Sequence, residues 1–249
     1  MIIRNEKLAE FLKPGKRVHM VGIGGVSMRP LALVLKDRGI HVTGSDMNSS
    51  GSTEELLRSG ISVAIGHREE NIQGADCIVR TAAARNDNPE IAAARAAGIP
   101  VFERAEAWGA IMRQYENALC VSGTHGKTTT TSMLTWMLEA NGLNPSFMIG
   151  GIARNLGRGG RFTDSDFCVL EGDEYDTSFF DKRSKFLHYL PEVVIINNIE
   201  MDHADIYANV EEIKLSFKRL LRVVPRTGVV FINADCPKGE ALGFLITSV

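Results

Sequence analysis

Short apolar stretches alternate with longer amphipathic stretches along the chain, and glycines mark most of the changes. The apolar stretches of the first half have the length and composition of buried strands. They cover residues 17–21, 41–44, 62–65 and 76–80. Helical spacing or helix-start signals lie between them, from Val26 to about Lys36, over residues 54–58 and from Asn88-Pro89-Glu90 onward. Strands that alternate with helices in this way predict an α/β fold whose parallel sheet is covered on both faces.

The same alternation continues in the second half. Predicted strands cover residues 118–122, 145–149, 167–170, 193–197 and 229–233, and predicted helices cover residues 130–139 and 210–221. Apolar side chains recur at helical spacing in both helices. They are Met133, Leu134, Met137 and Leu138 in the first, and Ile213, Phe217, Leu220 and Leu221 in the second. Because the pattern restarts near residues 113–118, we expect two domains, residues 1–115 and 116–249.

Composition and charge narrow the class of protein. With 249 residues, 44% apolar and 23% charged, the chain can bury a sizeable core. The formal net charge of −2 gives no reason to expect nucleic acid or a membrane surface as a partner. The charged N-terminus is unlike a secretory signal, and no apolar run approaches the roughly 20 residues of a membrane span. The four scattered cysteines favour buried thiols over disulfides or a zinc site, so we expect a cytoplasmic protein.

A glycine-containing turn joins the predicted strand at 118–122 to the predicted helix at 130–139. It reads Gly123-Thr124-His125-Gly126-Lys127-Thr128-Thr129. Glycine lets the backbone turn its N–H groups toward a phosphate, and the N-terminus of the following helix adds positive potential. Lys127 can reach terminal phosphates, and the hydroxyl of Thr128 can ligate Mg²⁺. The usual phosphate-binding loop has four residues between its glycines, whereas this one has two, so an ordinary turn before a helix is the alternative.

A second glycine turn follows the first predicted strand, where residues 22–28 read Gly-Ile-Gly-Gly-Val-Ser-Met. It resembles half of a dinucleotide fingerprint, because Ser27 stands where the third glycine is expected. Asp46 ends the next predicted strand, where an acidic residue often holds a ribose hydroxyl. These rules favour NAD as the ligand, but another nucleotide or an unliganded turn would also fit.

Acidic residues and one histidine follow two strands of the second half. The strand at 167–170 leads into Glu171, Asp173, Glu174 and Asp176, and the strand at 193–197 leads toward His203. The carboxyl ends of strands are where open α/β sheets place ligands, so Glu171 and His203 could join Thr128 around Mg²⁺ or Mn²⁺. A solvated acidic loop and a surface histidine are the alternatives.

Together these motifs resemble those of the Mur ligase family. The shortened loop at 123–129, Glu171-Gly172-Asp173-Glu174 and the Asn-x-x-x-Asp-His segment at 198–203 match the family's motifs. The first glycine turn, Gly44-Ser45-Asp46, Thr81-Ala82-Ala83, Asn88-Pro89-Glu90 and Arg104-Ala105-Glu106 are similar to the members that use L-alanine. Residues 173–186 and 202–206 are instead similar to the recycling members that attach a whole tripeptide.

The resemblance implies a Rossmann-like first domain that binds a UDP-linked substrate, followed by a P-loop domain that binds ATP and Mg²⁺. It replaces NAD by UDP and assigns that moiety to Gly22, Ile23, Gly24, Gly25, Val26, Asp46 and Thr81. ATP is assigned to residues 123–129, metal ligation to Thr128, Glu171 and His203, and catalysis to Lys127 and His203.

The implied activity is an ATP-dependent, ADP-forming ligase of peptidoglycan precursor synthesis. It would join L-alanine to the carboxylate of UDP-N-acetylmuramate through an acyl phosphate. A ligase that adds L-Ala-γ-D-Glu-meso-diaminopimelate, and a non-catalytic nucleotide-binding fragment, are the alternatives. The family continues beyond the segment matched here, so we expect the second domain to be truncated and the C-terminal ligase domain to be absent. Lys218 lies near the family's carbamylated lysine but is not assigned that modification.

Overall fold

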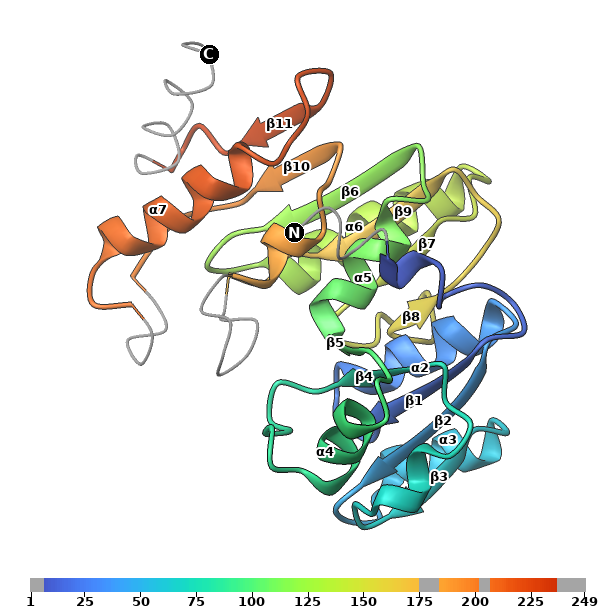
Figure 1. Ribbon diagram of the computed structural model, residues 1–249. Helices are drawn as coiled ribbons and strands as arrows, with labels where there is room; N and C mark the ends of the chain where they lie inside the picture. Colours follow the sequence, from blue (N-terminus) through green and yellow to red (C-terminus); the bar gives the residue numbers. More distant parts are fainter. Residues whose placement is uncertain (1–6, 175–183, 202–206, 237–249) are drawn as a thin grey trace. The chain divides into compact units, whose positions relative to one another are not determined.

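The computed structural model describes residues 7–174, 184–201 and 207–236 (Figure 1). The chain divides into two compact units, residues 1–111 with 160–162 and residues 112–159 with 163–249. Functional domains with bounds 1–115 and 116–249 stay a prediction.

The first unit contains a sheet of five parallel strands in the order β3-β2-β1-β4-β5. Its strands are β1 (Arg17–Val21), β2 (His41–Asp46), β3 (Ser62–Ile65), β4 (Cys77–Arg80) and β5 (Val101–Glu103). Its helices are α2 (Met28–Asp37), α3 (Gly51–Arg58), the short 3₁₀ helix η1 (Glu69–Ile72), α4 (Pro89–Ala96) and α5 (Arg104–Met112). The strand order reverses at β1, so α2 and α3 cover one face and α4 the other (Figure 1).

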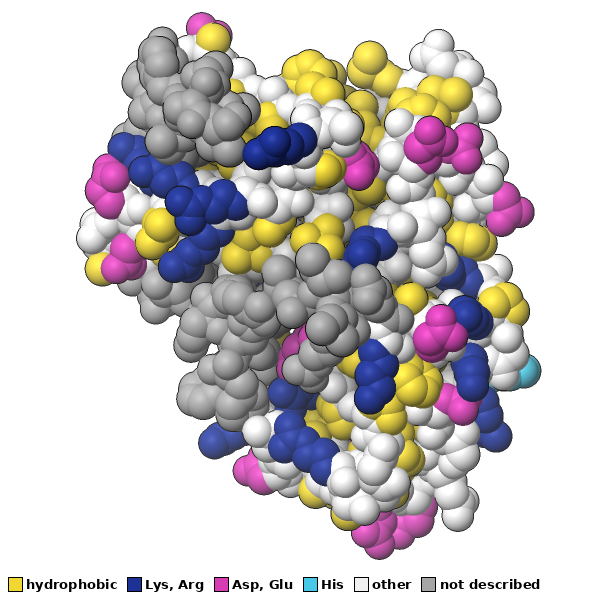
Figure 2. Space-filling model, turned by 45° about the horizontal axis from the view of Figure 1, so that its top comes forward, with side chains coloured by type: hydrophobic (Ala, Val, Ile, Leu, Met, Phe, Trp, Pro, Cys, Tyr) yellow, Lys and Arg dark blue, Asp and Glu magenta, His cyan; other side chains and the backbone are white. Residues whose placement is uncertain are grey.

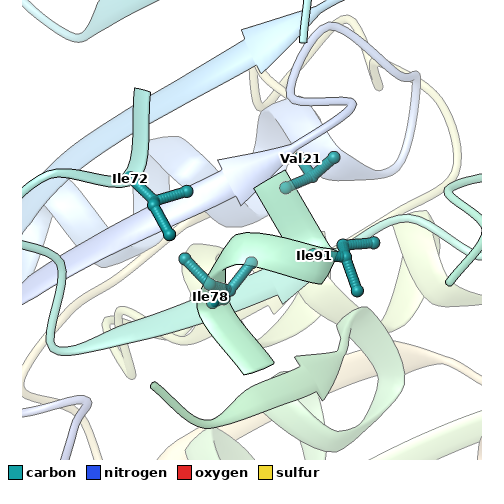
Figure 3. Packing of buried hydrophobic residues seen from close by; sticks show 5 residues of the cluster. Val21, Ile72, Ile78 and Ile91 are labelled. Atoms are coloured by element: carbon teal, nitrogen blue, oxygen red, sulfur yellow. The ribbon is translucent and has the colours of Figure 1, made fainter. Parts of the chain in front are cut away.

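Apolar packing fixes α4 on its sheet. Ile91 of α4 packs with Val21 of β1, Ile78 of β4 and Ile72 of η1, and all four side chains are buried (Figure 3). Asn88 caps the helix by accepting hydrogen bonds from the backbone N–H groups of its first turn, and Pro89 stands at the first helical position. This packing holds the first turn of α4 against the sheet.

The second unit contains the other sheet apart from β8, whose residues are counted with the first unit, and the strand order of this sheet is β11-β10-β6-β9-β7-β8. Its strands are β6 (Asn117–Ser122), β7 (Ser146–Met148), β8 (Gly160–Arg161), β9 (Phe167–Glu171), β10 (Val193–Ile196) and β11 (Val229–Ile232). Its helices are α6 (Lys127–Ala140), the 3₁₀ helix η2 (Lys185–His188) and α7 (Val210–Leu221). The pairings among β6, β7, β9, β10 and β11 are all parallel, which confirms the predicted fold class.

The buried face of α6 differs from the one that its apolar residues suggest. Met133 and Met137 are 61% and 60% exposed. Leu134 and Leu138 instead pack against the cluster of Phe147, Ile149 and Val169, beside the buried Thr131 and Thr135. Each threonine hydroxyl donates to the backbone carbonyl four residues earlier, so burial leaves no unsatisfied donor.

Helix α7 has the predicted bounds and buries Ile213, Phe217 and Leu220. Basic residues occupy its last turn, where they interact favourably with the helix dipole. Figure 2 shows basic side chains gathered over the region of this helix, and Arg219 in its last turn and Arg222 at its C-cap are both exposed.

Two further expectations concern cysteines and membrane spans. All four cysteines are free and buried, as predicted. Burial raises the pKa of the Cys77 and Cys120 thiols to about 12, so neither is a reactive thiolate near neutral pH. Within the described residues, no helix combines the length and apolar character needed to cross a bilayer.

Candidate functional site

Two glycines give the loop between β6 and α6 its shape. Gly123 has φ +139° and Gly126 has φ +76°, both in the region that side chains disfavour. A Cβ atom on Gly123 would lie 3.0 Å from Cβ of Asn197 and 3.1 Å from the backbone nitrogen of Asn198. Glycine is therefore required at position 123 both for the backbone conformation and because Asn197 and Asn198, which follow β10, approach closely.

Helix α6 begins at Lys127, directly after Gly126. Among the described residues, no side chain caps this start. The first N–H groups of a helix have no intrahelical partner and carry positive potential. An uncapped N-terminus behind a glycine turn is the arrangement that binds a phosphate group.

Residues that follow β10 hold the loop in place. Asn198 accepts from the Thr124 N–H with its backbone carbonyl (3.1 Å) and from the His125 N–H with Oδ1 (2.8 Å). The N–H of Glu200 donates to the Thr124 hydroxyl over 2.9 Å, and Asn197 Nδ2 donates to Thr130 Oγ1 over 3.0 Å. The neighbouring strand therefore fixes the loop without any ligand.

The ammonium group of Lys127 lies inside the loop. It donates to the carbonyl of Gly123 over 2.7 Å and lies 2.9 Å from both carboxylate oxygens of Glu174. The Glu174 side chain is only 2% exposed. Burial raises the pKa of its carboxyl group, although the charge of Lys127 acts in the opposite direction. Lys127 is therefore paired with the Glu174 carboxylate, whose ionised form is disfavoured by burial.

Thr128 and Glu171 form the second polar contact of the site. Thr128 Oγ1 donates to Glu171 Oε1 over 2.9 Å, and the N–H of Gly150 donates to Glu171 Oε2 over 2.8 Å. A hydroxyl beside a carboxylate is the oxygen donor set that Mg²⁺ prefers, so these residues fit that ion. His203, the third predicted ligand, lies outside the described residues, as does its neighbour Asp202.

Within the described part of the chain, no group of three or more His, Cys, Asp or Glu side chains could hold a metal ion. The predicted set of Thr128, Glu171 and His203 contains only two such residues. The structure thus brings together Thr128 and Glu171 and leaves the complete metal site a prediction.

An open cavity of about 540 Å³ adjoins the loop. It is lined by His125 and Gly126 of the loop, by residues 195–198 and by residues 231–233. Its position beside an uncapped helix start gives a bound molecule room next to a phosphate position.

The first glycine turn, after β1, is bonded to the end of β2. The N–H groups of Gly22 and Ile23 donate to the Ser45 carbonyl over 2.8 and 3.0 Å. The N–H of Gly24 donates to Asp46 Oδ2 over 2.8 Å. A Cβ atom on Gly22 would lie 2.5 Å from Cγ2 of Thr81. Four of the seven residues predicted for UDP, Gly22, Gly24, Asp46 and Thr81, therefore lie together.

The other three predicted residues, Ile23, Gly25 and Val26, belong to the same turn but differ in exposure. Ile23 is buried, whereas Val26 is 76% exposed. A Cβ atom on Gly25 would lie 3.3 Å from the carbonyl of Gly22, so the turn is tight there.

Comparisons with known proteins identify the family. The model "Mur ligase family, catalytic domain" matches residues 17–116, and "Mur ligase middle domain" matches residues 121–243. The chain belongs to the Mur ligase family.

Solved Mur ligase structures share its fold. The UDP-N-acetylmuramate:L-alanyl-gamma-D-glutamyl-meso-diaminopimelate ligase of Neisseria meningitides is 37% identical with a TM-score of 0.84. The match covers 91% of this chain and 74% of that one. The UDP-N-acetylmuramate–alanine ligase of Thermotoga maritima is 30% identical with a TM-score of 0.75, over 91% and 51% of the two chains.

Among curated Mur ligases, the UDP-N-acetylmuramate–L-alanine ligase of Acetivibrio thermocellus is 43% identical over 220 residues. That match covers 88% of this chain and 45% of the relative. The chain thus spans about half the length of the curated relatives that it matches.

Sequence reasoning missed three contacts of this Mur ligase site. It did not foresee that Glu174 would pair with Lys127, that Gly150 would orient Glu171, or that Asn197 would bond to α6. The adjacency of β6 to β9 and β10 explains the first and third contacts, and the adjacency of β9 to β7 explains the second. The position of Glu174 and Asn197 after the carboxyl ends of their strands was a signal for their two contacts. Nothing in the sequence indicated that Gly150 would bind the Glu171 carboxylate.

Proposed function

We propose that this chain carries the nucleotide-binding and UDP-substrate-binding parts of an ATP-dependent, ADP-forming amide ligase. One observation supports it above the others, namely that Lys127, Thr128 and Glu171 lie together at the start of α6. The names of the curated relatives favour L-alanine and UDP-N-acetylmuramate as substrates.

The proposed reaction joins two molecules through an activated carboxylate. The muramate carboxylate attacks the γ-phosphorus of ATP, ADP leaves, and an acyl phosphate forms. The amine of L-alanine then attacks the acyl carbon, phosphate leaves, and an amide remains. Because the carboxylate and the triphosphate repel each other, the protein must supply positive charge and hold them in line.

Residues of the loop would supply that charge. The N–H groups at the start of α6 would bind phosphate oxygens, and Lys127 would contact the terminal phosphates after leaving Glu174. Thr128 and Glu171 would hold Mg²⁺ together with His203, and His203 is also proposed to act in catalysis. When bound, Mg²⁺ neutralises part of the charge on the phosphates. The remaining loop residues Thr124, His125 and Thr129 are proposed to complete the ATP contacts.

The first domain, residues 1–115, is proposed to bind the UDP moiety, and residues 116–249 are proposed to bind ATP. Gly22, Ile23, Gly24, Gly25 and Val26 would face the diphosphate, with Asp46 and Thr81 beside it. The bonds among Gly24, Asp46 and the turn support this grouping. We further propose a cytoplasmic location, where thiols such as the four buried cysteines stay reduced.

Two other functions have specific support. The 37% identity to the tripeptide-adding ligase favours a peptide as the amine. The uncapped start of α6 beside an open cavity equally suits a chain that binds nucleotides without turnover.

A phosphate-release assay distinguishes these functions. Purified chain is mixed with Mg²⁺-ATP and UDP-N-acetylmuramate, and L-alanine or L-Ala-γ-D-Glu-meso-diaminopimelate is added in parallel. Release and amide formation with L-alanine alone is the expected result. Turnover only with the tripeptide would show that the tripeptide, not L-alanine, is the amine substrate. Binding of ATP and UDP-N-acetylmuramate without turnover would favour a chain that only binds nucleotides.

A further inference from the structure

The carboxylate of Glu90 lies at the centre of a buried polar cluster in the first unit. Its side chain is 0% exposed and stands at the second position of α4. Ser45 Oγ donates to it over 2.6 Å, Asn71 Nδ2 donates to it as well, and His67 Nδ1 lies 3.2 Å away. His19 Nε2 lies 3.6 Å from the same carboxylate. One side chain thus joins β1, β2, the segment after β3 and η1.

Ser45 connects this cluster to the first glycine turn. Its hydroxyl donates to Glu90, while its backbone carbonyl accepts from the N–H groups of Gly22 and Ile23. The next residue, Asp46, accepts from Gly24 with its side chain and from Gly66 with its backbone carbonyl. Ser45 therefore bonds to Glu90 through its side chain and to the glycine turn through its backbone carbonyl.

The charge of Glu90 is stabilised where it lies. Burial alone would raise the pKa of this carboxyl group, but the nearby His19 imidazole and the hydrogen bonds from Ser45 and Asn71 outweigh burial and lower it to about 2. The N-terminus of α4 adds favourable potential. The cluster therefore contains an ionised carboxylate at all ordinary pH values.

Packing alone does not explain this choice of residue. An apolar side chain would avoid the cost of burying a charge, but it would take away the acceptor of the Ser45 hydroxyl and the Asn71 amide. What the carboxylate adds is direction, because each of its hydrogen bonds fixes one partner atom.

We propose that Glu90 is a positioning residue for the UDP-linked substrate, acting through Ser45 on the glycine turn at residues 22–25. This inference rests on the proposed function of the first domain. Glu90 does not touch the substrate in this account. It sets where the backbone of the turn and the carboxylate of Asp46 lie when the diphosphate and ribose arrive.

The test compares Glu90→Gln with Glu106→Gln. Glu106 is a matched control because it is also a buried carboxylate near a helix start, where it accepts from the backbone N–H of Glu103 over 2.8 Å. The two readouts are amide hydrogen exchange at residues 22–25 and the calorimetric Kd for UDP-N-acetylmuramate. Glu90→Gln should speed exchange in the turn and weaken binding about tenfold. Glu106→Gln should leave both near the wild-type values.

Equal effects of the two variants, or unchanged exchange in Glu90→Gln, would overturn the proposal. If Glu90→Gln does not fold, Ser45→Ala decides, since it removes the same connection with a smaller change and should give the same pair of effects. A wild-type chain that does not bind UDP-N-acetylmuramate would contradict the proposed function of the domain. In that case faster amide exchange confined to residues 22–25 of Glu90→Gln would still show that Glu90 stabilises the conformation of the turn.

Discussion

The pairing of Lys127 with Glu174 has a direct consequence for nucleotide binding. Both oxygens of the carboxylate lie 2.9 Å from the ammonium, so a phosphate that binds Lys127 must displace them. Replacing the carboxylate by an amide keeps the shape but removes the competing charge.

We therefore expect Glu174→Gln to bind Mg²⁺-ATP about three- to tenfold more tightly than wild type. Fluorescence titration with a labelled ATP measures the change. Glu171→Gln serves as the matched variant, and it should weaken binding because it loses the carboxylate that bonds to Thr128. Weaker binding in Glu174→Gln would show that Glu174 assists the nucleotide rather than competing with it.

The ionisation of Glu90 should make the stability of the first unit depend on pH. Its pKa in the folded chain is about 2, below the ordinary value of 4.5, so its ionised form stabilises the fold. This stabilisation is fully present above about pH 4.5 and is lost as the pH falls toward 2. It amounts to roughly 3 kcal/mol at most. Urea unfolding at pH 7 and pH 3 should show a smaller difference in Glu90→Gln than in wild type, and equal differences would contradict this role.

At the scale of elements, helix α6 shows what periodicity can and cannot predict. Apolar residues at positions 133, 134, 137 and 138 correctly indicate a helix, because the 3.6-residue period is a property of the backbone. They do not identify its buried face. Thr131 and Thr135 face inward because their hydroxyls bond back to the helix, a partner that composition does not reveal. Strand β5 and helix α5, residues 101–112, were not predicted at all.

This face can be tested with two substitutions on one helix. Leu134→Ala removes side-chain atoms that pack on Phe147, Ile149 and Val169, and should lower the free energy of unfolding by about 1–2 kcal/mol. Met133→Ala removes an exposed side chain and should change it by less than about 0.5 kcal/mol. Chemical denaturation measures both, and a larger loss for Met133→Ala would contradict the assignment.

At the scale of the whole molecule, the alternation of strands and helices was enough to predict two parallel α/β units, which the structure and the comparisons confirm. The motifs were enough to predict the family, which the comparisons also confirm. Strand order was beyond reach, since β9 and β10 flank β6 through crossovers that leave no local signal. The contacts of Lys127 with Glu174 and of Thr124 with Glu200 follow from that order.

The central claim is that the start of α6 binds Mg²⁺-ATP through Lys127, Thr128 and Glu171. Calorimetric titration of ATP into wild type, Lys127→Ala and Lys214→Ala, with and without Mg²⁺, tests it most directly. Lys214 is the control because it pairs with Glu211 on α7 and is not part of the loop. We predict saturable, Mg²⁺-dependent binding in wild type and Lys214→Ala, and at least about tenfold weaker binding in Lys127→Ala. Equal affinity in all three proteins, or binding that is indifferent to Mg²⁺, would contradict the claim.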